Sequence, residues 1–379
     1  MNKIKIILSS ILLSLILNGG IAQEKYEFTD VVRIDATEVK NQQITGTCWS
    51  FSAASYIESE AINNDMPKLD LSEMFVVRNI YIDKALNYVR RQGTTQFGEG
   101  ALGNDFLQAA EKYGLVPEWI YPAREEDETY DHRELSLLLK SYLDGVIKNP
   151  AKKLSKQWLD GYKGILDAYM GEAPEEFEFD GKNYTPLSFA KEVVKFDIND
   201  YLYLTSFTHE LYYQPFVLQV PDNFSSASYY NVPLNELTNA INYALDQGFT
   251  LEWDADVSEK GFSGSKGIAI VPEKEWGEKT KEEKDSTLVL TENELEISEE
   301  LRQEQYENYL TTDDHLMHII GYANDQDGKL YYIVKNSWGN NRGYDGFVYV
   351  SSSYMKLKTI SIIVNKEGVS KDLKKKLEL

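Results

Sequence analysis

The sequence predicts an α+β protein of two lobes, with a helical lobe first and a strand-rich, barrel-like lobe last. Three observations favour this fold class. The 379 residues are 42% hydrophobic and 26% charged, which is a globular composition with enough chain for one large domain or two lobes. An alanine-rich apolar stretch at 51–62 has the spacing of a helix. Much later, the segment 314–322 reads as a strand that enters a core.

Residues 1–22 have the pattern of a secretory signal peptide. Two lysines precede an apolar run at 6–17, and small residues follow up to Ala22. A membrane anchor is the alternative, but the run is shorter than the ~20 residues that a spanning helix needs, and no second such run follows. No cysteine lies near the cleavage point to carry a lipid anchor. We therefore expect no membrane span and an exported protein, periplasmic or exterior, whose mature chain begins near Gln23.

Charge and cysteine content narrow the possible partners and raise a question. The formal net charge is −22. Nucleic-acid binding depends on Lys and Arg to neutralise phosphates, so we expect no nucleic-acid partner. Exported proteins usually carry disulfides, yet the one cysteine of this chain can form none internally. A single cysteine in an exported protein therefore points to a role other than an internal disulfide.

That cysteine, Cys48, lies at a junction between a loop and a helix. The polar segment 41–47 contains Gly46 and leads directly into the apolar stretch 51–62. A helix N-terminus carries partial positive charge, which favours a thiolate and lowers the pKa of a cysteine, and its free N–H groups can hold an oxyanion. From position alone, Cys48 is either a nucleophile or a buried, inert cysteine.

A thiol nucleophile needs an imidazole base, and the chain has four histidines. His132 lies in an acidic, polar stretch and His209 follows Ser-Phe-Thr, so we expect both to be solvated or structural. His315 and His318 remain, both in the strand-like segment. Residues three apart on a strand face opposite sides, so only one of these two can face Cys48.

The residues around Cys48 resemble the active-site segment of papain-like cysteine peptidases. A glutamine, Gln42, stands six residues before the cysteine, and the pattern Gly-x-Cys-Trp-x-Phe-Ser follows. The resemblance implies that Cys48 is the nucleophile and that Gln42 donates a side-chain N–H to the oxyanion hole, whereas Gln43 is at the wrong distance. Papain has a further cysteine where Thr45 stands here, so we expect papain's disulfide to be absent.

The same resemblance selects the base. In papain-like enzymes the catalytic histidine opens a strand and precedes a glycine by six positions, which matches His315 and Gly321. His318 is then a core or supporting residue. A later Asn-Ser-Trp-Gly segment matches the family's box of that sequence, so Asn336 is expected to bind the His315 ring and Trp338 to shield that bond from water. This chemistry uses no metal and no cofactor, and we expect none.

The spacing between Cys48 and His315 indicates a branch of the family. It is 267 residues, against the ~130–150 typical of papain-like enzymes, so an insertion of about one small domain lies between them. Several stretches resemble the bleomycin hydrolase and aminopeptidase C branch, which carries such an insertion. They are 71–73, 100–101, 104–107, 111–117, 121–122, 170–177, 185–189 and 253–257. The resemblance implies that substrate backbone pairs with Gly100 and Ala101, where the family usually has two glycines.

The resemblance also divides the chain. The expected parts are a signal peptide (1–22), a helical lobe with the cysteine (23–122), an inserted helical or mixed segment (123–245), a strand-rich lobe with the histidine and asparagine (246–366) and a short basic tail (367–379).

In this branch a C-terminal arm blocks the non-primed side of the cleft and receives the free amine of the substrate. Here the matching region ends early, and we expect the tail to be a surface helix end.

The expected function is that of an exported cysteine peptidase that hydrolyses peptide bonds through a thioester acyl-enzyme, similar to aminopeptidase C and bleomycin hydrolase. Without the arm, an endopeptidase or a dipeptide-releasing peptidase is an alternative. An inactive peptide-binding protein on the same scaffold is an alternative of another class. Expected partners are peptide substrates, and because relatives in this branch form hexameric rings, the resemblance also suggests a homohexamer.

Overall fold

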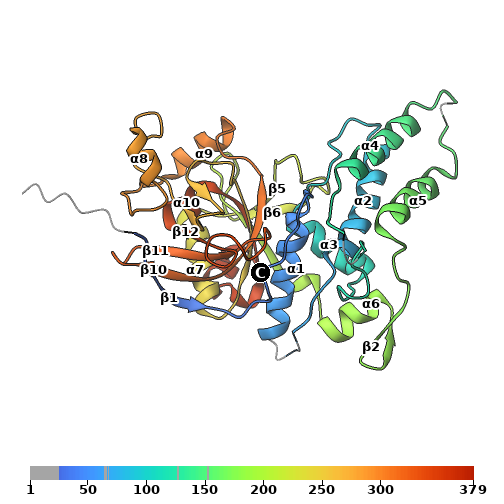
Figure 1. The fold of residues 1–379 in the computed structure, drawn as a ribbon, viewed down its shortest axis with the longest axis horizontal. Helices are drawn as coiled ribbons and strands as arrows, with labels where there is room; N and C mark the ends of the chain where they lie inside the picture. Colours follow the sequence, from blue (N-terminus) through green and yellow to red (C-terminus); the bar gives the residue numbers. More distant parts are fainter. Residues whose placement is uncertain (1–24, 64–65, 67, 126–127, 152) are drawn as a thin grey trace, which may run out of the picture.

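The computed structural model describes residues 25–379 except 64–65, 67, 126–127 and 152. A helical side and a strand-rich side lie next to each other, with α1 between them (Figure 1). The expected signal peptide and its cleavage point lie outside the described residues. In the part of the chain that is described, no helix is long and apolar enough to cross a lipid bilayer.

The helical side is built around α1 and α2, which are buried along most of their length. The α2 helix is fixed at its start by Ser72, whose hydroxyl accepts the backbone N–H of Phe75 at 3.0 Å. The α4 and α5 helices form the outer end of this side, against α2 (Figure 1). The elements here are α1 (Cys48–Asn63), α2 (Glu73–Arg90), α3 (Gly103–Tyr113), α4 (Arg133–Ile147), α5 (Trp158–Met170), β2 (Phe177–Phe179), β3 (Lys182–Tyr184), α6 (Pro186–Phe189), a π-helical turn (Ala190–Val194) and a 3-10 turn (Ile198–Asp200).

The strand-rich side is one sheet, in which the described residues form eleven strands. Ten of them run in the order β5-β6-β4-β13-β7-β10-β11-β12-β9-β8, and β1 pairs with the later half of β10. The strands are β1 (Phe28–Arg33), β4 (Tyr201–Thr205), β5 (Pro215–Val217), β6 (Ser228–Asn231), β7 (Leu251–Ala255), β8 (Phe262–Ser263), β9 (Ile268–Ala269), β10 (His315–Asp325), β11 (Leu330–Lys335), β12 (Phe347–Ser351) and β13 (Thr359–Asn365).

Side chains along the central strands alternate between the two faces of the sheet, and one face packs on α1 and the other on α7. Trp253 of β7 and Met317 of β10 face one way and share a core with α7 (Leu234–Asp246). The neighbouring Leu316 and Ile363 face the other way and join the core of α1. The start of β10 therefore lies beside the first turn of α1, and this arrangement positions the candidate site.

The structure distributes the segment 123–245 over both sides. Its first part forms α4 and α5 on the helical side, and its last part supplies β4, β5, β6 and α7 to the strand-rich side. The β1 strand, from the expected helical lobe, also joins the sheet, antiparallel to β10. These pairings join strands that are far apart in sequence, such as β4 and β13, so local periodicity does not reveal them.

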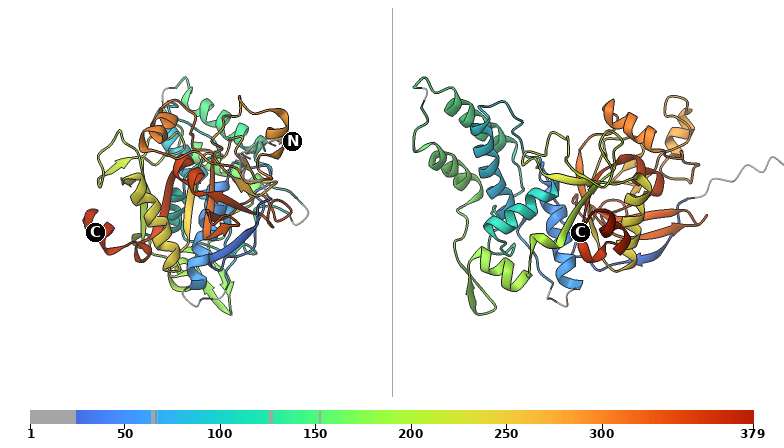
Figure 2. Two further views of the ribbon diagram at one scale, coloured as in Figure 1. Left: turned by 90° about the vertical axis from the view of Figure 1, so that its left-hand side faces the viewer. Right: turned by 180° about the vertical axis from the view of Figure 1, so that it is seen from behind.

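The described C-terminal residues lie on the strand-rich side. The remaining helices are α8 (Lys281–Ser286), α9 (Glu299–Glu307), α10 (Ser352–Lys358), a 3-10 turn (Lys366–Gly368) and α11 (Lys371–Lys376). Leu373 and Leu377 are buried in the core beneath α7, and Lys376 Nζ pairs with Glu236 Oε1 at 2.7 Å. Figure 2 shows this end of the chain from behind, close to α7.

Candidate active site

Cys48 is the first residue of α1, and its thiol lies against the start of β10. Its sulfur accepts the backbone N–H groups of Trp49 and of Leu316, which directly follows His315. The residue is 8% exposed. The thiol is thus placed at a helix N-terminus, where the dipole favours negative charge, and against the backbone of the residue that follows His315.

His315 is held by two neighbours from the Asn-Ser-Trp-Gly segment. Its Nε2 lies 2.8 Å from Asn336 Oδ1, and its ring stacks on Trp338 with 4.6 Å between centroids and 25° between planes. The same Oδ1 accepts the backbone N–H of Ser337 at 2.7 Å, which fixes the oxygen as an acceptor. His315 therefore donates from Nε2, and its Nδ1 is left as the basic nitrogen.

Gln42 lies in the turn that precedes Cys48, with its side chain fixed at both ends. Its Nε2 donates to Thr45 O at 2.7 Å, and its Oε1 accepts from Ser337 Oγ at 2.6 Å. A primary amide has two N–H groups, and this bond to Thr45 uses one of them. The next residue, Gln43, points away, because its Oε1 accepts the backbone N–H of Tyr130.

Glu99 ties the turn before Cys48 to the predicted substrate loop. Its carboxylate accepts the backbone N–H of Gly46 at 2.7 Å, and its carbonyl accepts Trp49 Nε1 at 3.0 Å. Gly100 and Ala101 follow directly, so the expected substrate loop lies beside the nucleophile; Ala101 itself is buried. No sequence pattern points to Glu99. Ser337, which orients Gln42, lies inside the recognised motif but had no expected role.

Burial governs the charge states of the two central groups. Burial raises the pKa of the Cys48 thiol to about 12, and the charges of Asp313 and Asp254 raise it further. Burial lowers the pKa of His315 to about 4, against the raising effect of its bond to Asn336. Either charge alone is therefore costly here. Moving the thiol proton to His315 creates both charges together, and each then offsets the cost of the other.

The other histidines have structural surroundings. His318 is fully buried, its Nδ1 lies 2.8 Å from Ser55 Oγ on α1, and burial keeps the pKa of its ring well below the usual value. His132 contacts the Tyr81 hydroxyl at 3.0 Å, and His209 contacts Gln303 at 2.9 Å. Of the four histidines, His315 is the one whose neighbour in the chain, Leu316, contacts Cys48. Across the described residues, no cluster of three or more His, Cys, Asp or Glu side chains could hold a metal.

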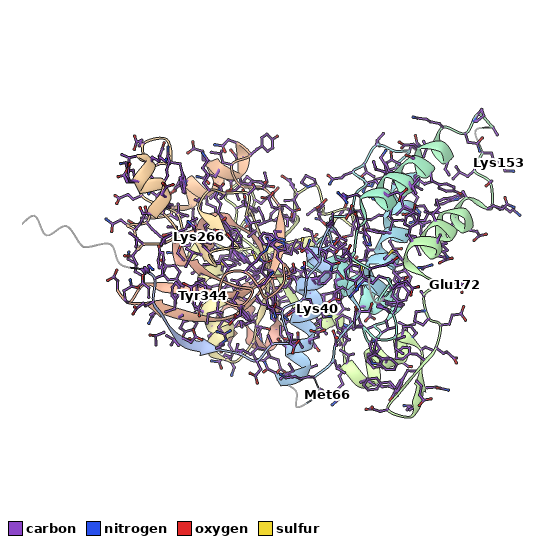
Figure 3. All side chains as sticks on the ribbon, viewed as in Figure 1. Lys40, Met66, Lys153, Glu172, Lys266 and Tyr344 are labelled. Carbon is purple, nitrogen blue, oxygen red and sulfur yellow. The ribbon has the colours of Figure 1, made fainter. Side chains whose placement is uncertain are left out.

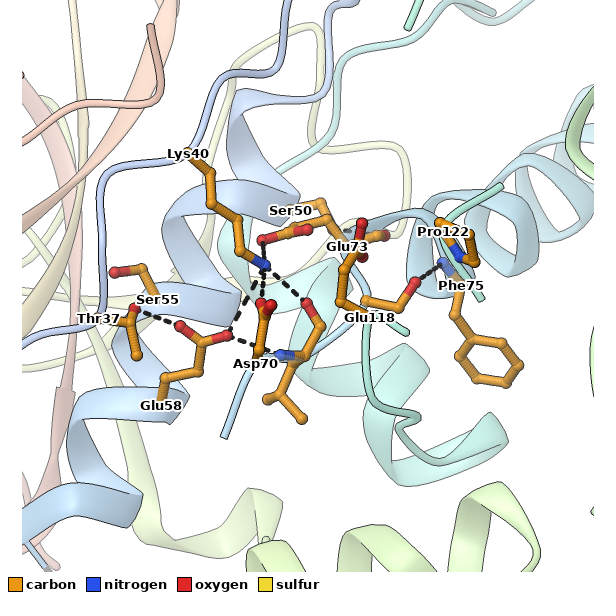
Figure 4. A network of polar contacts seen from close by, with 12 residues as sticks. Thr37, Lys40, Ser50, Ser55, Glu58, Asp70, Glu73, Phe75, Glu118 and Pro122 are labelled. Carbon is orange, nitrogen blue, oxygen red and sulfur yellow. Dashed lines mark hydrogen bonds and ion pairs between the residues drawn. The ribbon is translucent and has the colours of Figure 1, made fainter. Parts of the chain in front are cut away.

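A buried network behind the site anchors the segment that leads to Gln42 and Cys48. Lys40 Nζ binds Glu73 Oε1 at 2.7 Å, Asp70 Oδ1 at 2.5 Å and Leu71 O at 3.0 Å (Figure 4). Glu58 of α1 accepts the Leu71 N–H at 2.8 Å. Figure 3 places Lys40 between the two sides of the molecule. The network joins this segment to α1 and to the start of α2, and so fixes the backbone before the nucleophile.

Comparison with known proteins gives the family. The sequence profile of the Peptidase C1-like family matches residues 102–379. The chain belongs to this family. The profile of the papain family cysteine proteases also matches, over residues 24–135, which include Cys48. The papain-like family predicted from the motifs is thereby confirmed, and the protein is a cysteine peptidase by family.

Curated relatives of this C1-like peptidase match over most of their length. Aminopeptidase G of Lactobacillus delbrueckii subsp. lactis is 23% identical, over 90% of this chain and 85% of the relative. Aminopeptidase C of Listeria monocytogenes is 23% identical, over 89% of this chain and 82% of the relative. The crystal structure of PepW from Lactobacillus rhamnosis superimposes with a TM-score of 0.70 at 19% identity, covering 92% of this chain and 84% of PepW. This likeness confirms the predicted α+β, papain-like fold.

Proposed function

We propose that the protein is an exported cysteine aminopeptidase in which Cys48, His315 and Asn336 form the catalytic triad. The observation that carries the proposal is the contact set around one imidazole. Asn336 Oδ1 lies 2.8 Å from His315 Nε2. The Cys48 sulfur accepts the backbone N–H of Leu316, the residue after His315. These contacts support a nucleophile, a base and an orienting group in one place, as this chemistry requires.

The reaction cycle follows from these positions. His315 Nδ1 takes the thiol proton as the sulfur of Cys48 attacks the peptide carbonyl carbon. The resulting oxyanion is held by the Cys48 backbone N–H and by the second N–H of Gln42. His315 then protonates the leaving amine, and a thioester remains on the sulfur. Water that is deprotonated by His315 attacks the thioester carbonyl. The carboxylic acid product leaves, and His315 returns the proton to the Cys48 sulfur.

Removal of single N-terminal residues is supported by the relatives. Those named aminopeptidase G and aminopeptidase C align with nearly nine tenths of this chain. The described C-terminal residues pack on α7 through Lys376 and Glu236, so they do not supply the amine-binding arm expected from the branch. An endopeptidase or a dipeptide-releasing peptidase is therefore the second candidate function.

Export and assembly are further parts of the proposal. The apolar leader at 1–22 supports secretion to the periplasm or exterior, and the resemblance to ring-forming relatives supports a homohexamer. N-terminal sequencing of protein recovered from culture medium and periplasm would locate the cleavage point, which we expect near Gln23. Sedimentation of the mature protein would give its oligomeric state.

Labelling of the thiol tests the catalytic proposal. Iodoacetamide or a peptidyl epoxide should modify Cys48 in the wild type, and His315→Ala should lose most of this labelling because the base is gone. Fluorogenic aminoacyl substrates should be hydrolysed by the wild type and not by Cys48→Ala. A wild-type protein that binds peptides without hydrolysing any would instead establish an inactive binding protein. Full activity of Cys48→Ala would refute the role of the thiol.

A further inference from the structure

Two acidic side chains of β7 lie on the side of the sheet that packs against α1. Glu252 and Asp254 alternate with Trp253, so they lie on the α1 face of the sheet, and each is 1% exposed. Asp254 stands opposite Leu316, whose N–H contacts the Cys48 sulfur. Asp254 is thus one strand away from the position where the substrate carbonyl is attacked.

A third carboxyl, Asp313, completes a pair with Asp254. Asp313 precedes His315 by two residues, and the two aspartates share a hydrogen bond in which Asp254 donates. Apart from this shared bond, no donor in the described part of the chain reaches Asp254 Oδ1, Asp313 Oδ2 or Glu252 Oε1. Buried carboxyl oxygens are normally satisfied by donors, so these oxygens are free to accept hydrogen bonds from a group outside the chain.

A loop between β5 and β6 brings one more carboxyl to the predicted substrate loop. A Cβ on Gly100 would lie 1.9 Å from Asp222 Oδ2, so the glycine leaves room for this carboxylate. Gln96 Nε2 binds the other oxygen of Asp222 at 2.8 Å, and Asn104 Nδ2 binds Ser225 Oγ of the same loop at 3.1 Å. The loop therefore crosses from the strand-rich side to the helical side next to Gly100.

Charge around this point is unbalanced. Asp222, Asp254 and Asp313 act on one another electrostatically, and Lys84 is the cation that acts on Asp222 and Asp313. Lys84 Nζ is itself bound to the Gly100 carbonyl. Because Asp254 and Asp313 share one proton, this pair and Asp222 together present two negative charges against this cation, so the region beside the thiol attracts a positive group.

We propose that Asp254 and Asp313 form a subsite that binds an ammonium group of the substrate beside Cys48, with Asp222 closing it. The proposal deepens the proposed peptidase function and rests on it. An ammonium carries three N–H donors, enough to reach the oxygens of Asp254 and Asp313 that lack other donors. The α-amine of the residue before the scissile bond and a basic side chain share this chemistry. An acylated, neutral N-terminus would leave the carboxyls without a counter-charge.

Binding of such a group also has a consequence for the nucleophile. The charges of Asp313 and Asp254 add to the burial that raises the pKa of Cys48. An ammonium between the two aspartates would cancel that contribution, because opposite charges in close contact neutralise each other's field. Substrates with the cation would therefore favour the thiolate, and neutral substrates would not.

The test compares isosteric amide variants on three substrates. Wild type, Asp313→Asn and the Asp254→Asn, Asp313→Asn double variant are assayed with aminocoumarin amides of alanine, arginine and N-acetylarginine. Loss of a charge-assisted hydrogen bond should lower kcat/KM about 10- to 100-fold. A loss with free alanine identifies the α-amine as the ligand, whereas a loss confined to the two arginine substrates identifies the side chain. Unchanged kcat/KM on all three substrates would overturn the subsite.

Controls separate this subsite from folding and from the catalytic proposal. Glu60→Gln removes another buried carboxyl, twelve residues along α1 from Cys48, and should leave all three rates unchanged. Circular dichroism and thermal denaturation report whether each variant is folded. Asp313 is only partly buried, so Asp313→Asn keeps the test decisive if the double variant does not fold. Activity that persists in Cys48→Ala would refute the catalytic proposal, whereas activity that needs Cys48 but ignores both aspartates refutes the subsite alone.

Discussion

Gln42 and Gln43 are adjacent glutamines with opposite surroundings. Gln42 is fixed by Thr45 and Ser337 beside the thiol, while Gln43 binds the backbone of Tyr130. We predict that Gln42→Ala lowers kcat about 10²- to 10³-fold, because an oxyanion donor is lost, with a smaller change in KM. Steady-state kinetics on a fluorogenic substrate measures this. Gln43→Ala is the matched control and should stay near wild type; equal losses in both variants would contradict the oxyanion role.

Glu60 gives a pH-dependent prediction for stability. Burial raises the pKa of this carboxyl from 4.5 to about 7 in the folded protein. The folded state thus holds the proton more tightly than the unfolded state, so this group favours folding below pH 4.5 and loses that effect as pH rises through about 7. Glu60→Gln should therefore raise the free energy of unfolding at pH 8 by about 1–3 kcal/mol relative to wild type.

Urea denaturation of Glu60→Gln at pH 8 and pH 5 checks this sign. The gain over wild type should shrink at pH 5, where the native glutamate is mostly protonated in the folded state. The exposed Glu178→Gln is the control, and it should show no such pH dependence. A gain that is equal at both pH values would contradict the assignment to Glu60.

At the residue scale, the sequence predicts those site residues that lie within a short contiguous motif. Cys48 and Asn336 each lie in a contiguous pattern, and His315 follows from its distance to Gly321. The structure brings these three residues together, and their roles stay predictions. Asp254 and Asp313 are 59 residues apart in the chain and meet only because β7 pairs with β10. Their one local signal is the alternation of acidic residues around Trp253, which by itself reads as a solvated strand face.

At the scale of elements, α2 depends on its first cap. The Ser72 hydroxyl accepts the Phe75 N–H at 3.0 Å and donates to Tyr121 O at 2.5 Å, and the residue is buried. Ser72→Ala should cost about 1–2 kcal/mol in the free energy of unfolding, because it leaves two buried backbone groups without partners. Chemical denaturation measures this cost.

Ser298→Ala is the matched control for that helix cap. Ser298 caps α9 through the Leu301 N–H at 3.2 Å in a more exposed setting. Water can replace the lost hydroxyl there, so we expect a smaller loss of stability than for Ser72→Ala. A larger loss for Ser298→Ala would contradict the importance of burial at the start of α2.

Elements with local signals were predictable, and their long-range pairing was not. A helix was expected over 51–62 and is found as Cys48–Asn63; a strand was expected at 314–322 and is found as His315–Asp325. Helix periodicity and apolar runs carry these signals within one segment. The parallel pairing of β4 with β6 and the antiparallel pairing of β4 with β13 depend on contacts across the chain, so no local pattern specifies them.

At the scale of the whole molecule, α1 couples the two sides. It is buried between α2 and α3 on one side and β10 on the other, and the Ser52 hydroxyl donates to Met317 O at 2.7 Å. Leu316 and Ile363 of the sheet share the core of the helical side. We predict one cooperative thermal transition, because neither side can unfold without exposing α1. Calorimetry together with far-UV circular dichroism checks this; two resolved transitions would contradict it.

The most direct test of a Cys48-dependent aminopeptidase is mass spectrometry of the products from one peptide, supplied with a free and with an acetylated N-terminus. The wild type should release single residues in order from the free peptide and leave the acetylated peptide intact. Cys48→Ala should release nothing from either. Internal fragments from the acetylated peptide would contradict the aminopeptidase mode, and cleavage by Cys48→Ala would contradict the central role of the thiol.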